Sequence, residues 1–231
     1  MKKSIVLFSG GLDSTTAIYW ALERYEKVFA LTFDYGQRNR IELDMAGKVA
    51  QKLSVPQKIL RVNLKQIGGS SLTDTKLSVP QYERMEESEE GLPSTYVPFR
   101  NGIFLALAAA WAEVVGIKEI VCGFNVIDSP NYPDTRKQFI QAMQEAINLG
   151  TKASLSPEKI KIIAPFLKMK KSDIIKEGLS LNVDYSFAIS CYCGEEIPCQ
   201  KCSSCVLRQK AWEEVGLQDP LILRLEEEGK I

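Results

Sequence analysis

Residues 4–16 have the sequence SIVLFSGGLDSTT, in which a short apolar run breaks into a glycine turn and then into small hydroxyl residues. The apolar run, residues 4–8, predicts a buried strand, and residues 15–24 are compatible with a helix. Gly10 and Gly11 let backbone N–H groups converge on an anion without interference from Cβ atoms. The start of a helix adds unpaired N–H groups and a positive dipole end. The stretch therefore predicts a phosphate-binding loop.

Neither of the two commonest phosphate loops is present. The pattern G-x-x-x-x-G-K-[ST] needs a lysine beside its last hydroxyl residue, and G-x-G-x-x-G is also missing. The remaining pattern, S-G-G-L-D-S at residues 9–14, resembles the PP-loop of the ATP pyrophosphatases, which cleave ATP between the α and β phosphates to adenylate a substrate. The resemblance implies an ATP site made of Phe8, Ser9, Gly10, Gly11, Leu12, Asp13, Ser14, Thr15 and Thr16. The alternative is a plain glycine turn, with Asp13 or Ser14 capping an ordinary helix.

The composition limits the class of protein. A chain of 231 residues with 45% apolar and 25% charged residues predicts one globular domain with a sizeable core. The 29 basic residues balance 29 acidic ones, and no basic run occurs, which argues against a nucleic-acid partner. With no apolar stretch of about 18 residues and no signal-like segment, we expect a soluble, cytoplasmic protein without a membrane partner. The chain has no histidine, so imidazole can serve neither as a base nor as a metal ligand.

Strand and helix patterns alternate along the chain. After the first strand we expect strands at residues 27–34, 58–62, 118–123 and 159–163, and helices near 39–53, 99–115, 135–149 and from 172. Residues 64–93 lack periodicity and predict a mobile flap, with plain disorder as the alternative. The alternation predicts an α/β fold, a Rossmann-like parallel sheet with helices on both faces. Ligands of such sheets bind beyond the carboxyl ends of the strands, where Asp34 and Tyr35 are placed to meet a nucleoside.

Five of the six cysteines gather near the C-terminus, at positions 191, 193, 199, 202 and 205. Two overlapping C-x-x-C steps bring three thiolates into one turn, and Cys191 or Cys193 can complete a tetrahedron. Buried free thiols do not explain this crowding, so we predict a metal site. A Cys₄ set is typical of structural zinc, and an iron–sulfur cluster is the alternative. Cys122 lies in a predicted strand and is expected to pack in the core.

Longer matches extend over nearly the whole chain. Besides FSGGLDSTT they are DYGQR (34–38), VPFRN (97–101), YPDTR (132–136) and SCYCGEEIPCQKCSSCVLR (190–208). Together they resemble the 7-cyano-7-deazaguanine synthase family of queuosine precursor biosynthesis, whose fold is adenine nucleotide alpha-hydrolase-like. The resemblance implies a single PP-loop domain over 1–231, with a zinc-binding segment at about 186–215, and a homodimer. It also implies a ligase that uses ATP, Mg²⁺ and ammonia to convert 7-carboxy-7-deazaguanine to the nitrile through an amide.

The resemblance further implies the roles of individual residues. The catalytic set comprises Ser9, Asp13, Ser14 and Lys171. The loop hydroxyls would hold the leaving pyrophosphate, and Asp13 would bind Mg²⁺. Lys171 would neutralise the negative charge of the pyrophosphate. A solvated lysine at the end of a helix is the alternative for Lys171. The implied zinc ligands are Cys191, Cys199, Cys202 and Cys205, because Cys193 is a thiol that the family motif does not require.

Substrate recognition is predicted from the chemistry of a deazaguanine. The base presents an N–H/NH₂ edge that a carboxylate accepts, a flat face for an aromatic ring and a carboxylate for a cation. The candidates are Asp128 or Asp134 for the edge, Phe99 or Tyr132 for the face, and Arg100 or Arg136 for the carboxylate. Asp134 can alternatively cap a helix that begins near residue 135. At two positions, Asn39 and Phe99, the chain departs from the family, which often has His and Gly there.

Two other classes of function remain. One is a tRNA-thiolating PP-loop enzyme, which would need a catalytic cysteine pair or an iron–sulfur cluster. The other is a nucleotide-binding sensor without chemistry. The neutral net charge and the absence of an appended RNA-binding module disfavour the first, and the closed cysteine site beside a late lysine disfavours the second.

Overall fold

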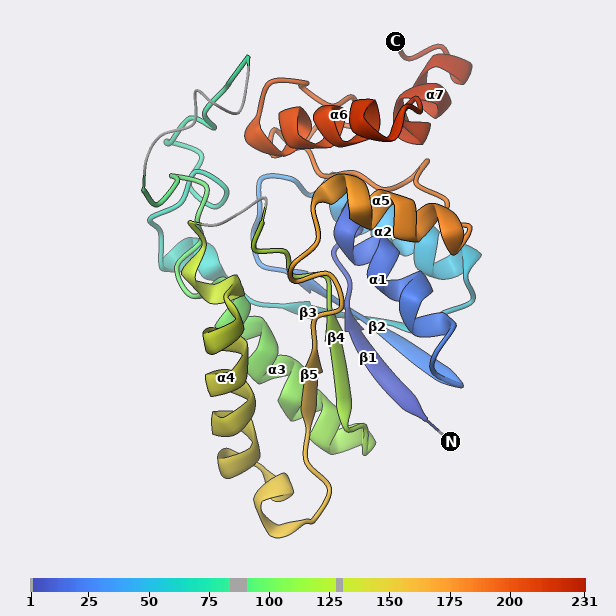
Figure 1. The fold of residues 1–231 in the computed structure, drawn as a ribbon. Coiled ribbons are helices and arrows are strands. Elements are labelled where there is room, and N and C mark those ends of the chain that lie inside the picture. The colour runs from blue at the N-terminus through green and yellow to red at the C-terminus, as the bar shows by residue number, and fades with distance from the viewer. Residues whose placement is uncertain (1, 84–90, 128–130) are drawn as a thin grey trace.

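The computed structural model describes residues 2–83, 91–127 and 131–231. Within these residues, five parallel strands form one sheet in the order β3-β2-β1-β4-β5 (Figure 1). The strands are β1 (Lys3–Leu7), β2 (Lys27–Asp34), β3 (Gln57–Arg61), β4 (Glu119–Cys122) and β5 (Lys161–Ile163). The predicted α/β class with a parallel sheet is confirmed.

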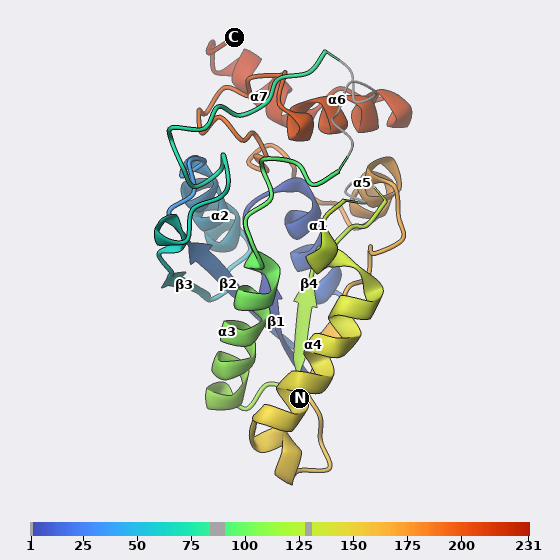
Figure 2. The ribbon, with the colours of Figure 1, turned by 90° about the vertical axis from the view of Figure 1, so that its left-hand side faces the viewer.

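Helices cover both faces of the sheet (Figures 1 and 2). One face carries α1 (Leu12–Leu22), α2 (Ile41–Lys52) and α5 (Lys171–Ser180), and the other carries α3 (Arg100–Val115) and α4 (Lys137–Gly150). Successive side chains of a strand point to opposite faces, so Val6 packs in the core beneath α1 while Ile5 packs in the core beneath α3. Both side chains are fully buried. This explains why the central strands β1, β2 and β4 are largely apolar runs without alternation. None of the helices in the described ranges is long and apolar enough to cross a lipid bilayer.

The strand order reverses between β1 and β4, and the phosphate loop lies at this point. Leu7 of β1 is in register with Cys122 of β4, so the two strands end side by side. A Cβ atom on Gly123 would lie 2.8 Å from the backbone oxygen of Asp13, which only glycine avoids. A reversal of strand order is where open α/β sheets bind their ligands.

Two helices that sequence patterns did not predict lie beyond the carboxyl ends of the strands (Figures 1 and 2). They are α6 (Ser203–Val215) and α7 (Pro220–Glu227). Helix α6 packs against α5, with the Trp212 ring edge-on to Tyr185 at a centroid distance of 5.4 Å. Arg208 of α6 forms an ion pair with Asp219, which also caps α7 by accepting a hydrogen bond from the Leu221 N–H at 3.0 Å. The C-terminal segment is thereby fixed over the site end of the sheet.

The described part of the predicted flap is anchored to the fold. It contains one short 3₁₀ helix, η1 (Leu64–Gln66), and residues 70–73 are buried. The Arg38 N–H donates to the Leu72 carbonyl at 2.8 Å, and the Tyr82 N–H donates to the Lys201 carbonyl at 2.7 Å. Residues 84–90, which the prediction also covers, lie outside the described residues. Two more 3₁₀ turns flank α4, η3 (Pro133–Thr135) and η4 (Lys152–Leu155).

Gly10 offers a test of how tightly the phosphate loop is packed. Its φ is +85°, and an added Cβ atom would lie 2.8 Å from the Glu42 carbonyl oxygen. Gly10→Ala should therefore lower the free energy of unfolding by about 2 kcal/mol or more, measured by chemical denaturation. Gly150→Ala, in α4 with open space around it, is the matched control and should be neutral or slightly stabilising. Equal effects of the two substitutions would contradict this packing.

Candidate active site

A cavity of about 290 Å³ lies at the carboxyl ends of β1, β2 and β4. Part of its lining is apolar and comes from the sheet, α3 and the loop after β4, with Leu7, Leu31, Phe33, Phe104 and Phe124. The other part is polar and comes from the β2–α2 connection, α2 and the C-terminal segment, with Gln37, Asn39, Glu42, Ser190, Ser204 and Arg208. The rings of Phe33 and Phe104 stack at 4.0 Å. One cavity therefore offers both a flat apolar surface and a set of hydrogen-bonding groups.

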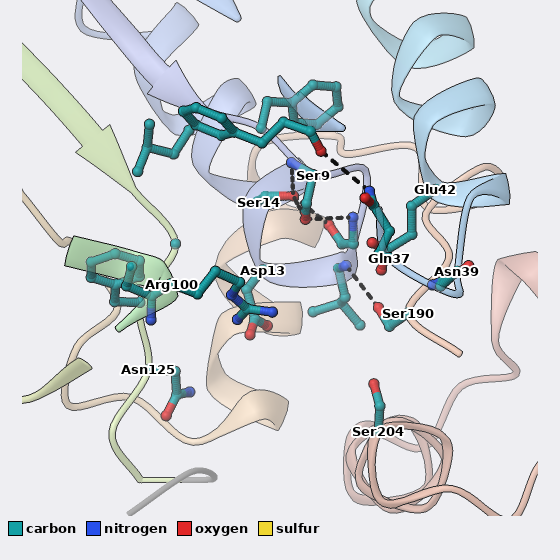
Figure 3. Close-up of a pocket in the computed structure, with 18 of the residues that line it drawn as sticks. Ser9, Asp13, Ser14, Gln37, Asn39, Glu42, Arg100, Asn125, Ser190 and Ser204 are labelled. Carbon is teal, nitrogen blue, oxygen red and sulfur yellow. Dashed lines mark hydrogen bonds between the residues drawn. The ribbon is translucent and has the colours of Figure 1, made fainter. Parts of the chain in front are cut away.

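The phosphate loop forms one wall of this cavity (Figure 3). Phe8, Ser9, Gly11, Leu12, Asp13 and Ser14 all line it. The Ser9 and Ser14 hydroxyl oxygens lie 3.1 Å apart, and the Ser14 hydroxyl donates to the Gly11 carbonyl at 3.0 Å. Neither Asp13 nor Ser14 accepts a hydrogen bond from a first-turn N–H of α1, which contradicts the alternative in which one of them caps an ordinary helix; the Leu12 N–H instead donates to the Ser190 hydroxyl at 3.2 Å. The two hydroxyls and the start of α1 instead face the same space.

Three residues of the implied ATP site do not line the cavity. The Thr16 hydroxyl lies 2.7 Å from the Tyr185 hydroxyl in the core, and the Thr15 hydroxyl oxygen is also buried. Gly10 packs against the first turn of α2. These three residues therefore support the loop through contacts with the core and with α2 and do not face the cavity.

Lys171, at the start of α5, reaches the loop. Its Nζ lies 3.0 and 3.2 Å from the two carboxylate oxygens of Asp13. The lysine side chain is only 15% exposed, which contradicts the alternative of a solvated lysine at a helix end. A cation and a carboxylate thus stand together beside the phosphate-binding hydroxyls.

The two residues predicted to meet a nucleoside are separated by the structure. Tyr35 lines the cavity, and its hydroxyl oxygen accepts a hydrogen bond from the Arg100 guanidinium at 3.2 Å. Burial raises the pKa of Tyr35 above its ordinary value. Asp34 does not line the cavity, because its carboxylate pairs with Arg40 at 3.1 Å.

Two of the six predicted substrate residues, Arg100 and Tyr132, line the cavity. Phe99 does not, because it has a left-handed φ of 53° at the start of α3, where its ring packs against Phe139 and remains 51% exposed. Asp134 does not either, since its buried carboxylate accepts the Asn101 N–H at 3.0 Å and so caps α3, not α4. Arg136 is exposed at the start of α4, away from the cavity lining. Asp128 lies outside the described residues.

Sequence patterns missed much of the polar lining. Ser190, Ser204 and Arg208 belong to the C-terminal motif, but nothing in the motif assigned them to the cavity. Asn39 follows DYGQR; it is 5% exposed, its amide interacts with the Glu42 carboxylate, and neither of its polar atoms has a partner at ordinary hydrogen-bond length. Burial raises the pKa of Glu42 to about 8, against the opposing effect of the Arg100 guanidinium. No local signal marks Glu42, because its burial depends on contacts that are distant in sequence.

The cysteine cluster is closed and contains Cys191. The ligand sulfurs of Cys191, Cys199, Cys202 and Cys205 all lie within 4.8 Å of one another, and Cys193 is not among them. Backbone N–H groups point at the sulfurs, with Cys199 N to Cys191 Sγ at 3.3 Å and Cys202 N to Cys199 Sγ at 3.2 Å. N–H donors of this kind stabilise thiolates, so the set fits one four-coordinate metal ion. Its position beside Ser190, Tyr192 and Ser204 fixes that wall of the cavity.

These features define a PP-loop protein of the ATP-using α/β class: a parallel sheet, the S-G-G-L-D-S loop where the strand order reverses, and a lysine that faces this loop. The family model for queuosine biosynthesis protein QueC matches residues 3–216, and the chain belongs to this family. A 7-cyano-7-deazaguanine synthase from Pseudomonas savastanoi pv. phaseolicola is 44% identical over 222 residues, 95% of each chain. Another, from Thermoplasma volcanium, is 46% identical over 95% of this chain and 90% of the relative.

Similarity to solved structures supports the fold. A 4-thiouridine synthetase, determined as an RNA complex with bound ATP, superposes with a TM-score of 0.50 and 18% identity. The match covers 97% of this chain and 53% of that one.

The cysteine assignment predicts different outcomes for two neighbouring thiols. Cys202→Ala should lower both bound metal and the free energy of unfolding, because metal-binding energy is folding energy in such a segment. Cys193→Ala is the control and should retain both. Elemental analysis and denaturant unfolding of the purified variants measure the two quantities. Loss of metal in Cys193→Ala with retention in Cys191→Ala would show that the fourth ligand is misassigned.

The raised pKa of Glu42 predicts a pH dependence of stability. A carboxyl group whose folded-state pKa exceeds its ordinary value of 4.5 contributes stability below that value, and the contribution is lost as pH rises toward about 8. Glu42→Gln removes the ionisation. The variant should therefore gain stability relative to wild type between pH 5 and 8, by at most about 1.4 kcal/mol per pH unit. Parallel stability curves in denaturant unfolding would show that Glu42 ionises as freely in the folded protein as in water.

Proposed function

We propose that the protein is an ATP-dependent carbon–nitrogen ligase that converts 7-carboxy-7-deazaguanine and ammonia to 7-cyano-7-deazaguanine in queuosine biosynthesis. Family membership over residues 3–216 supports the substrate and product. The observation that supports the chemistry most directly is the phosphate loop at the start of α1, where Lys171 faces Asp13 in a cavity large enough for more than phosphate.

The reaction needs two activations. In the first, a carboxylate oxygen attacks the α-phosphorus of ATP, the bond to the bridging oxygen breaks, and pyrophosphate leaves. Ammonia then displaces AMP from the acyl adenylate and loses a proton, which gives the amide. In the second, the amide oxygen attacks the α-phosphorus of another ATP and pyrophosphate leaves; loss of AMP and of the two N–H protons then forms the nitrile. Each step replaces a poor leaving group by a good one.

The protein contributes alignment and charge neutralisation. The Ser9 and Ser14 hydroxyls and the N–H groups at the start of α1 would hold the departing pyrophosphate. Lys171 would neutralise the charge that grows on it. Asp13 would hold Mg²⁺, which would offset the negative charge of the phosphates. Tyr35 and the stacked phenylalanines offer a flat surface suited to the adenine ring.

The metal of the cysteine cluster is proposed to be structural zinc. All four candidate ligands are thiols in a closed set, and such a site has no open position for water or substrate. We extend the proposal to a cytoplasmic homodimer, on the family resemblance alone. The partners proposed are small molecules, consistent with 29 basic residues balancing 29 acidic ones.

A thiolating function is less well supported. Four of the six cysteines are grouped as ligands, and Cys122 is buried in β4, where burial raises its pKa to about 12. Such a thiol is inert at neutral pH. A sensor without chemistry would not need a lysine such as Lys171 in contact with the Asp13 carboxylate of the phosphate loop.

Incubation with 7-carboxy-7-deazaguanine, ammonium and Mg-ATP should yield the amide and then the nitrile, with AMP and pyrophosphate, as followed by mass spectrometry. Lys171→Met should lower turnover by about 10²-fold or more with an unchanged fold. Lys168→Met, an exposed lysine just before α5, is the control and should match wild type. Absence of nitrile from the wild-type protein, or full activity in Lys171→Met, would contradict the proposal.

A further inference from the structure

Two carboxylates line the cavity within the described residues, Asp13 and Glu42. Asp13 is paired with Lys171 and belongs to the phosphate loop. Glu42 comes from the first turn of α2, whose backbone packs directly against Gly10 of that loop. Figure 3 shows Glu42 with Gln37 and Asn39 on one side of the cavity, beside Ser190. The proposed reaction gives Asp13 a role and leaves Glu42 without one.

Asn39 is a second sign of a ligand at this place. The residue lines the cavity and is 5% exposed, and its amide interacts with the neighbouring Glu42 carboxylate and lowers the pKa of that group, yet neither its nitrogen nor its oxygen has a partner at ordinary hydrogen-bond length. A buried amide without partners is costly, and folded proteins rarely leave one in that state. A bound molecule that accepts from the amide N–H would remove the cost.

The two side chains together match one edge of a deazaguanine. The pyrimidine edge of this base presents a carbonyl oxygen, a ring N–H and an amino group in a row. A carboxylate accepts from the last two, and an amide N–H donates to the first. Asp134, a sequence-based candidate for this contact, is already engaged by the Asn101 N–H.

We propose that Glu42 and Asn39 read the pyrimidine edge of the deazaguanine, Glu42 accepting from the ring N–H and amino group and Asn39 donating to the carbonyl. This assignment rests on the proposed function. It places the base between α2 and the C-terminal segment, where Ser190 and Tyr192 also line the cavity. The phosphate loop is the neighbouring wall, so a base held here has its reactive substituent in the same cavity as the nucleotide.

Equilibrium binding tests the assignment with two ligands and Mg-ATP. The ligands are 7-carboxy-7-deazaguanine and its analogue without the 2-amino group. Wild type should prefer the amino compound by about tenfold to a hundredfold, since a buried hydrogen bond to a charged group has that value. Glu42→Gln should bind the amino compound more weakly by a similar factor and lose the preference, because its amide oxygen can accept from the ring N–H while its NH₂ group meets the amino group as donor against donor. Asn39→Ala should weaken both ligands equally and leave the preference intact.

Controls separate this inference from the proposed function. Asp44→Asn alters an exposed carboxylate in the same turn of α2 and should behave as wild type. Mg-ATP affinity should stay within about twofold in every variant, since none of these side chains is assigned to the nucleotide. The inference is overturned if Glu42→Gln still prefers the amino compound, or if it loses affinity for Mg-ATP as much as for the base. Nitrile formation by the wild-type protein would still support the proposed function in that case. Wild type that binds neither compound overturns both.

Discussion

The close approach of backbones around the phosphate loop is the constraint on which the site depends. Gly123 at the end of β4 leaves room for the Asp13 carbonyl on one side, and Gly10 leaves room for the first turn of α2 on the other. With no Cβ atoms between them, strand ends and helix starts that are far apart in sequence converge on one space. Packing of this kind has little freedom to relax, so the loop is held ready for an anion before one binds.

The rest of the cavity is assembled onto this loop from the C-terminal segment. The Leu12 N–H, in the first turn of α1, donates to the Ser190 hydroxyl at 3.2 Å, which ties the two ends of the chain together. Ser190 immediately precedes Cys191, and the thiol cluster and the Arg208–Asp219 ion pair fix the segment from the other side. A structural metal ion would therefore act on substrate binding without touching the substrate, by holding the wall that residues such as Ser190 and Tyr192 form.

The sequence predicted what short-range patterns determine. The eight-residue apolar run Lys27–Asp34 matches β2 at both ends, and the glycine turn correctly marked the phosphate loop. Short-range patterns could not show that Asp134 caps α3, or that Thr16 faces Tyr185, because these contacts join positions that are 33 and 169 residues apart in the sequence. Helix α6 was missed for the same reason, because its buried residues pack against α5 and the cysteine segment without a clear helical period. Helix α7 was overlooked although it carries local signals, an Asp219 cap and Pro220 at its first position.

The central claim is that this loop holds ATP for cleavage between its α and β phosphates by the carboxylate of a deazaguanine. Exchange of labelled pyrophosphate into ATP, measured without ammonia, tests it most directly because it isolates the first activation. The account predicts exchange that requires 7-carboxy-7-deazaguanine and that Lys171→Met abolishes. Exchange without the acid, or acid-dependent release of ADP and phosphate in place of exchange, would contradict it.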